Sequence, residues 1–265
     1  MVTTPPALQL YTLRDEIANG RRKDILHAVR SFGYGAVEPY DVLTDPEQQR
    51  ADLDEAGLAA CAVHAKAIGA EAEAFFKGAK TVGADTVIVP WADPERFATE
   101  EAITELARDL NESADKAAAH GLRLGYHNHW FELESNVGGT AGLEALAAKL
   151  DPRIVLEVDT YWAAVGGHAD PAGSNVPALL ERLGDRVRYL HVKDGPVVDR
   201  DDVMTAVGTG RMPVADILAA ARHAEWHVVE LDRCATDMLT AVRESLEWLA
   251  GNGLATPLSA SPGEA

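Results

Sequence analysis

Residues 122–132, LRLGYHNHWFE, begin as an apolar run and end in two histidines, an asparagine and a carboxylate. A short apolar run of this kind indicates a buried strand. Successive side chains of a strand point to opposite faces, so His127 and His129 are expected to share a face. Because nitrogen and oxygen atoms at the end of a buried strand are costly without a partner, this stretch predicts a metal site or a polar-substrate site.

The same alternation of a short apolar run and a longer helical pattern occurs along the whole chain. We expect strands at residues 7–13, 35–38, 58–64, 85–90, 122–129, 153–159, 186–193 and 226–231. A helix is expected after each strand, at residues 23–31, 46–56, 70–82, 94–120, 142–150, 175–183, 213–223 and 237–250. Parallel strands need long crossovers, so the pattern indicates βαβ units of the α/β class.

Eight such units in about 250 residues predict a single (β/α)8 TIM barrel. A doubly wound sheet is the structural rival, but it normally carries a Gly-rich phosphate loop after its first strand, where this chain has QLYTLRDE. We therefore expect one barrel domain over residues 1–250. Residues 251–265, which are mostly small, are expected to form a flexible tail.

The charge balance restricts the class of partner. The chain has 24 Lys plus Arg and 42 Asp plus Glu, a formal net charge of −18, which opposes binding to nucleic acid and to anionic membranes. No apolar run approaches the roughly 20 residues that span a bilayer, and the N-terminal residues do not resemble a secretory signal. A cytoplasmic location is expected.

Polar residues end nearly every predicted strand, including Glu38 and His64, and four later ones have the spacing of a shared site. Glu132, Asp159, His191 and Glu230 are separated by 27, 32 and 39 residues, and a βα unit is about 30 residues long.

The spacing therefore assigns one ligand to each of four consecutive strands. Each residue alone has a simpler explanation as a solvated, structural or helix-capping residue, but four in succession favour a site. Three carboxylates and one imidazole suit Mn²⁺, Mg²⁺ or Co²⁺, with Zn²⁺ as an alternative, and the carboxylates would repel one another without a cation.

The motifs YHNHWFELE, LEVDTYW, YLHVKD and VVELD occur in this order and resemble the sugar phosphate isomerase/epimerase family with the xylose isomerase-like TIM barrel. QLYTLRDE and GYGAVEPYD extend the likeness over residues 7–248. The resemblance implies one divalent metal at the barrel mouth, with Asp159, His191 and Glu230 as three ligands. The fourth is either His127, where many members carry Glu, or Glu132 of the YHNHxFE subgroup, which we favour because carboxylates suit a hard metal.

The resemblance also implies the activity. An isomerase or epimerase of this family moves a proton next to a ketose carbonyl through an enediolate, and Glu132 and Glu230 are the expected proton-transfer pair. The substrate is expected to be a sugar, a sugar phosphate or a keto-polyol, and related barrels suggest a homodimer or homotetramer. The expected substrate-binding residues are His64, His127, His129, Trp162 and Lys193.

Three other functions compete with this one. A keto-polyol or keto-glycoside dehydratase or lyase of the inosose dehydratase type shares the first proton abstraction. An apurinic-site endonuclease uses three metals and further histidines, but the fourth strand ends VPWADPE without one, and the net charge opposes DNA binding. A non-catalytic sugar-binding barrel has no need for paired carboxylates around a metal.

Overall fold

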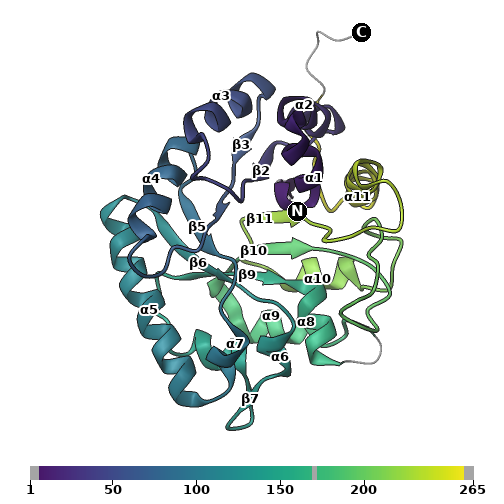
Figure 1. Ribbon diagram of the computed structural model, residues 1–265. Coiled ribbons are helices and arrows are strands. Elements are labelled where there is room, and N and C mark those ends of the chain that lie inside the picture. Colours follow the sequence, from purple (N-terminus) through teal and green to yellow (C-terminus); the bar gives the residue numbers. More distant parts are fainter. Residues whose placement is uncertain (1–5, 169–171, 260–265) are drawn as a thin grey trace.

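The computed structural model describes residues 6–168 and 172–259, and these form a barrel of parallel strands surrounded by helices (Figure 1). The sheet order is β3-β2-β1-β11-β10-β9-β6-β5-β4. The strands are β1 (Pro6–Gln9), β2 (Ala36–Glu38), β3 (Ala59–Ala60), β4 (Val63–His64), β5 (Thr86–Val89), β6 (Arg123–His127), β9 (Val155–Asp159), β10 (Val187–Val192) and β11 (Trp226–Val229). The two edge strands, β3 and β4, are separated by only Cys61 and Ala62 and together fill the third predicted strand. The sheet is therefore nearly closed, which confirms the predicted TIM barrel.

The outer layer contains the predicted helices with small shifts at their ends. They are α2 (Arg22–Phe32), α3 (Pro46–Ala56), α4 (Ala72–Val82), α5 (Glu100–Ala119), α7 (Gly142–Ala147), α9 (Val176–Leu183), α10 (Val214–Ala220) and α11 (Met238–Gly251). The longest, α5, begins where the Thr99 hydroxyl accepts a hydrogen bond from the amide of Ala102 at 3.2 Å. Ile103, Leu106 and Leu110 recur at helical spacing and are buried against the barrel.

Several short elements were not predicted. The 3₁₀ helix η1 (Leu10–Leu13) replaces the second half of the first predicted strand, because the Gln9 side chain accepts a hydrogen bond from the Tyr11 amide at 3.0 Å. The remaining unpredicted elements are α1 (Arg14–Glu16), η2 (Ile17–Arg21), α6 (Phe131–Glu134), the hairpin β7 (Asn136–Val137) and β8 (Thr140–Ala141), α8 (Thr160–Gly167) and η4 (Gly184–Arg186). The 3₁₀ helix η3 (Pro94–Phe97) forms the start of the helix predicted at residues 94–120, which is interrupted before α5. Helix α8 follows β9 without a loop, because Asp159 caps it by accepting from the Trp162 amide at 2.8 Å.

The barrel interior is filled in layers, because alternate residues of each strand point inward. The lowest layer is apolar and is built from Ala7, Ala36, Cys61, Ala62, Ile88, Val155, Tyr189 and Val228. The middle layer is polar and consists of Gln9, Glu38, His64, His127, Glu157 and His191. The outward-facing residues of the same strands, such as Leu156 and Leu190, pack in the larger apolar layer beneath the helices. This layering places a polar floor inside an otherwise apolar core.

The described part of the expected tail lies against the barrel. The Leu258 amide donates to the Gly33 carbonyl at 2.8 Å, and Arg30 donates to the Ser259 carbonyl at 3.1 Å. Ala255 is buried. Leu258 and Ser259 are thus held at the C-terminal end of α2, whereas residues 260–265 of the predicted tail lie outside the described residues. Across residues 6–168 and 172–259, no helix is long and apolar enough to cross a membrane.

Candidate active site and metal centre

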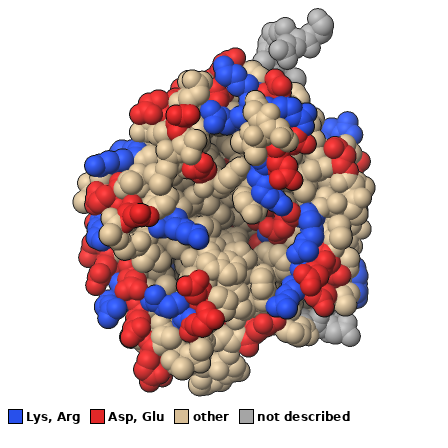
Figure 2. Space-filling model, in the orientation of Figure 1, with Lys and Arg blue, Asp and Glu red and all other residues tan. Residues whose placement is uncertain are grey.

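A pocket of about 740 Å³ opens at the carboxyl ends of the barrel strands. Figure 2 shows this hollow at the centre of the face, with Lys and Arg side chains beside it. Sites in TIM barrels lie at this end, because the loops after the strands surround it. Six of the predicted site residues line the pocket, namely His64, His127, His129, Trp162, Lys193 and Glu230.

An ammonium group and three carboxylates meet on the pocket floor. Lys193 Nζ lies 2.8 Å from Asp159 Oδ2, 2.7 Å from Glu230 Oε2 and 2.7 Å from Asp232 Oδ2. The Lys193 side chain is only 1% exposed, so its ion pairs with Asp159 and Glu230 are shielded from solvent, whereas the Asp232 side chain is 27% exposed. Burial alone would raise the pKa of Glu230, but Lys193 and His191 hold that pKa well below its usual range. Glu230 is therefore ionised where it faces the pocket.

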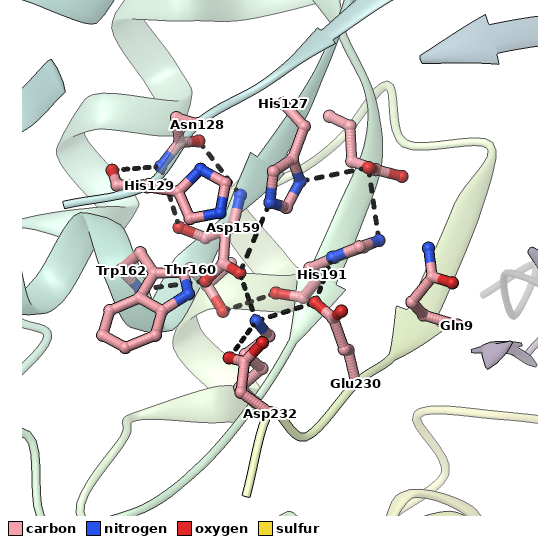
Figure 3. Close-up of polar contacts among 12 residues, drawn as sticks. Gln9, His127, Asn128, His129, Asp159, Thr160, Trp162, His191, Glu230 and Asp232 are labelled. Carbon is pink, nitrogen blue, oxygen red and sulfur yellow. Dashed lines mark hydrogen bonds and ion pairs between the residues drawn. The ribbon is translucent and has the colours of Figure 1, made fainter. Parts of the chain in front are cut away.

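Two imidazoles lie beside these carboxylates (Figure 3). His191 Nδ1 is 2.6 Å from Glu230 Oε2, and His127 Nε2 is 3.9 Å from Asp159 Oδ2. His127, Asp159, His191 and Glu230 each offer one ligand atom, and these four atoms lie within 4.8 Å of one another. Two nitrogen and two oxygen donors in this arrangement fit a divalent transition metal.

The protonation of His127 agrees with a ligand role. Burial, and then the nearby His191, lower the pKa of His127 to about 3, so its imidazole is neutral at physiological pH. A metal binds the lone pair of a neutral imidazole. Burial raises the pKa of Asp159 to about 6, although Lys193 and His191 oppose that shift. A bound cation would likewise favour the ionised form of Asp159.

The middle polar layer lies directly beneath this group. Glu157 Oε2 is 2.6 Å from His64 Nε2, 3.1 Å from His127 Nδ1 and 3.2 Å from His191 Nε2. Glu38 Oε2 accepts from Gln9 at 2.7 Å and lies 2.8 Å from His191 Nε2. Burial and the charge of Glu157 raise the pKa of Glu38. These contacts make a second buried group of titratable side chains.

The sequence interpretation did not single out Glu157 or Gln9. The signal was present, because Glu157 stands two residues before Asp159 and therefore faces the same side of the strand. It was hidden by its neighbours in LEVD, which are typical of a buried strand.

Glu132 is the predicted ligand that the structure does not bring together with the others. Its Oε1 accepts from the Tyr126 hydroxyl at 2.8 Å, and its Oε2 accepts from the His129 amide at 2.9 Å. The chain leaves β6 after His127 and turns into α6, so the side chain folds back onto the turn. Burial raises the pKa of Glu132 to about 8. The alternative first ligand, His127, lies in the group with Asp159, His191 and Glu230, where Glu132 was expected.

Aromatic rings form one wall of the pocket. Lys193 Nζ lies 5.5 Å from the centroid of Trp162, whose ring packs edge-on against Trp130 at 5.2 Å. The His129 ring contacts Trp91 at 4.6 Å, and its buried Nδ1 has no hydrogen-bond partner among the residues described. Such a wall suits the apolar face of a sugar ring.

The long loop after β10, residues 194–212, lies at the site. The Asp194 carboxylate accepts four backbone N–H groups, from Gly195, Gly208, Gly210 and Met212, at 2.8 to 3.0 Å. This single buried side chain therefore hydrogen-bonds to both ends of the loop and holds them together. Arg200 and Asp201, from the loop's outer part, line the pocket.

Comparison with known proteins agrees with this architecture. An inosose dehydratase of Mesomycoplasma hyopneumoniae (strain 7448) is 28% identical over 130 residues, which are 49% of this chain and 40% of that protein. The match thus spans less than half of that relative's length.

Two solved structures share the fold. A sugar phosphate isomerase/epimerase from Parabacteroides distasonis ATCC 8503 superposes with a TM-score of 0.77 at 20% identity, covering 97% of this chain and 96% of that one. The IOLI protein with a bound zinc atom superposes with a TM-score of 0.71 at 13% identity, covering 97% of this chain and 100% of that one. The family model described as xylose isomerase-like TIM barrel matches residues 26–251. Since that match spans most of the sequence, the chain belongs to the xylose isomerase-like TIM barrel family, as its motifs suggested.

Proposed function

We propose that the protein is a divalent-metal-dependent isomerase or epimerase that moves a proton next to the carbonyl of a sugar or keto-polyol. The observation that carries this proposal is the convergence of His127, Asp159, His191 and Glu230 within 4.8 Å at the pocket floor. The isomerase/epimerase name of one similar structure and the zinc of another support it. We retain the predicted cytoplasmic location and homodimeric or homotetrameric state as parts of the proposal.

His127 Nε2, His191 Nδ1, Asp159 and Glu230 would hold the ion. Two imidazoles move the preference away from Mg²⁺, which favours oxygen ligands, and toward Zn²⁺, Mn²⁺ or Co²⁺. When bound, such an ion acts as a Lewis acid that polarises a carbonyl and stabilises negative charge on its oxygen.

Proton transfer falls to residues of the chain that face the pocket. Glu230 is ionised and lines the pocket, so its carboxylate is the group we assign to accept the substrate proton. Lys193 holds that carboxylate in place at 2.7 Å. Both oxygens of Glu132, the other predicted proton-transfer residue, are engaged by Tyr126 and the His129 backbone. We therefore assign proton return to Glu230 itself, which carries the proton taken from the substrate and gives it back to the substrate.

A dehydratase acting on a keto-polyol is the second candidate. The inosose dehydratase similarity favours it, and the same proton abstraction begins the reaction. Elimination then expels a hydroxyl group and leaves an enone that absorbs ultraviolet light, whereas epimerisation does not. The apurinic-site endonuclease is disfavoured, because β5 is followed by Pro90 and Trp91, with no histidine there.

The test is to incubate the purified protein with ketoses and keto-polyols in D₂O and to follow deuterium at the carbon next to the carbonyl by NMR. We expect exchange that a chelator abolishes and that Glu230→Gln lacks. His127→Ala should lower the bound metal, whereas Glu132→Gln should retain it. A protein that binds no divalent ion, with exchange unchanged by a chelator, would refute the proposal. Product absorbance separates the two candidates.

A further inference from the structure

Glu157 lies beneath the pocket floor, where the proposed reaction gives it no role. Its side chain is fully buried, yet one oxygen, Oε2, faces three imidazoles. The distances are 2.6 Å to His64, 3.1 Å to His127 and 3.2 Å to His191. An ionised carboxylate only accepts hydrogen bonds, so the imidazole nitrogens that face it carry hydrogen.

The rings of His127 and His191 connect the two polar layers. His127 presents Nδ1 to Glu157 and Nε2 to Asp159. His191 presents Nε2 to Glu38 and Glu157, at 2.8 and 3.2 Å, and Nδ1 to Glu230 at 2.6 Å. In each ring, one nitrogen therefore faces the lower carboxylates and the other faces the mouth.

We propose that Glu157 is a positioning residue that selects the ring tautomer of His127 and fixes the direction of its metal-binding nitrogen. By accepting N–H from His127 Nδ1 at 3.1 Å, it leaves the lone pair of His127 Nε2 directed at the mouth. Histidine ligands of metals in general donate their second N–H to a carboxylate or a carbonyl in this way. The inference rests on the proposed metal site and explains an otherwise unused buried charge.

A second ion in the lower layer is the competing explanation. His64, His127, Glu157 and His191 also offer ligand atoms within 4.8 Å of one another. Filling both positions at once would require His127 and His191 to lose both ring protons, because the two positions use opposite nitrogens of the same rings. The lower nitrogens already lie at hydrogen-bond distance from a carboxylate. One ion per chain, at the mouth, is therefore expected.

The first measurement needs no variant. In metal-free protein labelled with ¹⁵N-histidine, we expect His127 to be protonated at Nδ1 and not at Nε2, as read from long-range ¹H–¹⁵N correlations. The second measurement is zinc affinity by chelator competition. Glu157→Gln should weaken zinc binding about 10- to 100-fold and alter the tautomer signals, because an amide offers one acceptor oxygen and adds two donors. Glu157→Asp, which keeps the carboxylate, should recover part of the loss.

The matched control is Asp52→Asn, which removes a buried carboxylate that pairs with Arg22 at 2.7 Å outside the barrel interior. It should leave zinc affinity and the tautomers unchanged. The inference is overturned if wild-type His127 carries its hydrogen on Nε2, if Glu157→Gln binds zinc within twofold of wild type, or if two zinc ions bind and the variant loses one. A wild-type chain that binds no zinc refutes the proposed function, and the tautomer measurement then still decides the role of Glu157.

Discussion

Replacing Lys193 with Met should destabilise the metal-free protein strongly, and a divalent ion should restore it. The Lys193 ammonium is the shared counter-ion of Asp159, Glu230 and Asp232 at 2.7 to 2.8 Å. Methionine keeps the length of the side chain and removes the charge. The variant therefore leaves three carboxylates at the pocket floor without their nearest cation.

The magnitude follows from the burial of the network. Removing one partner of a buried ion pair costs about 3–5 kcal/mol, because the remaining charge stays desolvated. Lys193 is 1% exposed and the side chains of Asp159 and Glu230 are at most 6% exposed, so little is lost to solvent screening. In a chain of this size, roughly 2–4 °C of melting temperature corresponds to each kcal/mol. The metal-free variant should therefore melt roughly 6–20 °C below wild type.

Thermal melting with and without Zn²⁺ is the assay. At a free concentration 100 times its dissociation constant, the ion should raise the free energy of unfolding by about 2.7 kcal/mol. At an equal free concentration of the ion, the gain should be larger in the variant than in wild type, because the ammonium and the ion compete for the same oxygens of Asp159 and Glu230. Lys77→Met, at an exposed position, is the control and should change stability by less than about 0.5 kcal/mol. An unchanged melting temperature, or an ion that stabilises wild type but not the variant, would refute this reasoning.

Three further predictions concern pH, the loop and packing. Burial lowers the pKa of His227 to about 4. Between about pH 6.5 and pH 4 the unfolded chain therefore binds a proton that the folded chain does not, and the free energy of unfolding should fall by about 3 kcal/mol as the pH drops through that window. Urea unfolding of wild type and His227→Leu checks this, and an equal dependence of the unfolding free energy on pH in both proteins would contradict it. Asp194→Asn replaces one of two accepting oxygens by an NH₂ group and leaves two of four loop amides unpaired. The free energy of unfolding should fall by about 2–6 kcal/mol, and hydrogen exchange of those two amides should become faster. Gly208→Ala should lower the free energy of unfolding by about 2–5 kcal/mol, because φ is 89° and an added Cβ would overlap Trp248. Gly251→Ala, with open space around it, is the control and should not destabilise the protein when both variants are compared by thermal melting.

The barrel could be predicted because its signal is repeated along the chain. Each strand is a short apolar run followed by an amphipathic helix, and helix ends such as Gly33, with φ 108°, stop the pattern where a left-handed residue is needed. Helix α8 escaped prediction because TYWAAVGG has no polar face. A helix that is apolar on all sides is buried, and its periodicity is then invisible.

The first ligand could not be decided from spacing, because spacing along the chain does not fix the path of a turn. Glu132 stands five residues after the end of β6 at His127. A carboxylate at that distance reaches the barrel mouth only if the chain continues outward from the strand. Here α6 begins at Phe131, and the Glu132 side chain turns back to the His129 amide at 2.9 Å. Local hydrogen bonding of the turn thus directs the Glu132 carboxylate away from the group formed by His127, Asp159, His191 and Glu230.

The strand register determines how deep each inward-facing side chain lies in the barrel, which the sequence alone does not show. His127 pairs with Glu157, whereas His191 pairs with Asp159, one inward-facing position higher. The two imidazoles therefore start from different heights. His127 has its Nδ1 level with Glu157 and reaches up to Asp159 with Nε2, whereas His191 reaches down to Glu38 with Nε2 and keeps Nδ1 beside Glu230. Alternation in the sequence shows that these residues face inward, but only the stagger of the strands brings a nitrogen of each ring to the same level at the mouth. A carboxylate below both rings is what such opposed orientations require, and this is the position of Glu157.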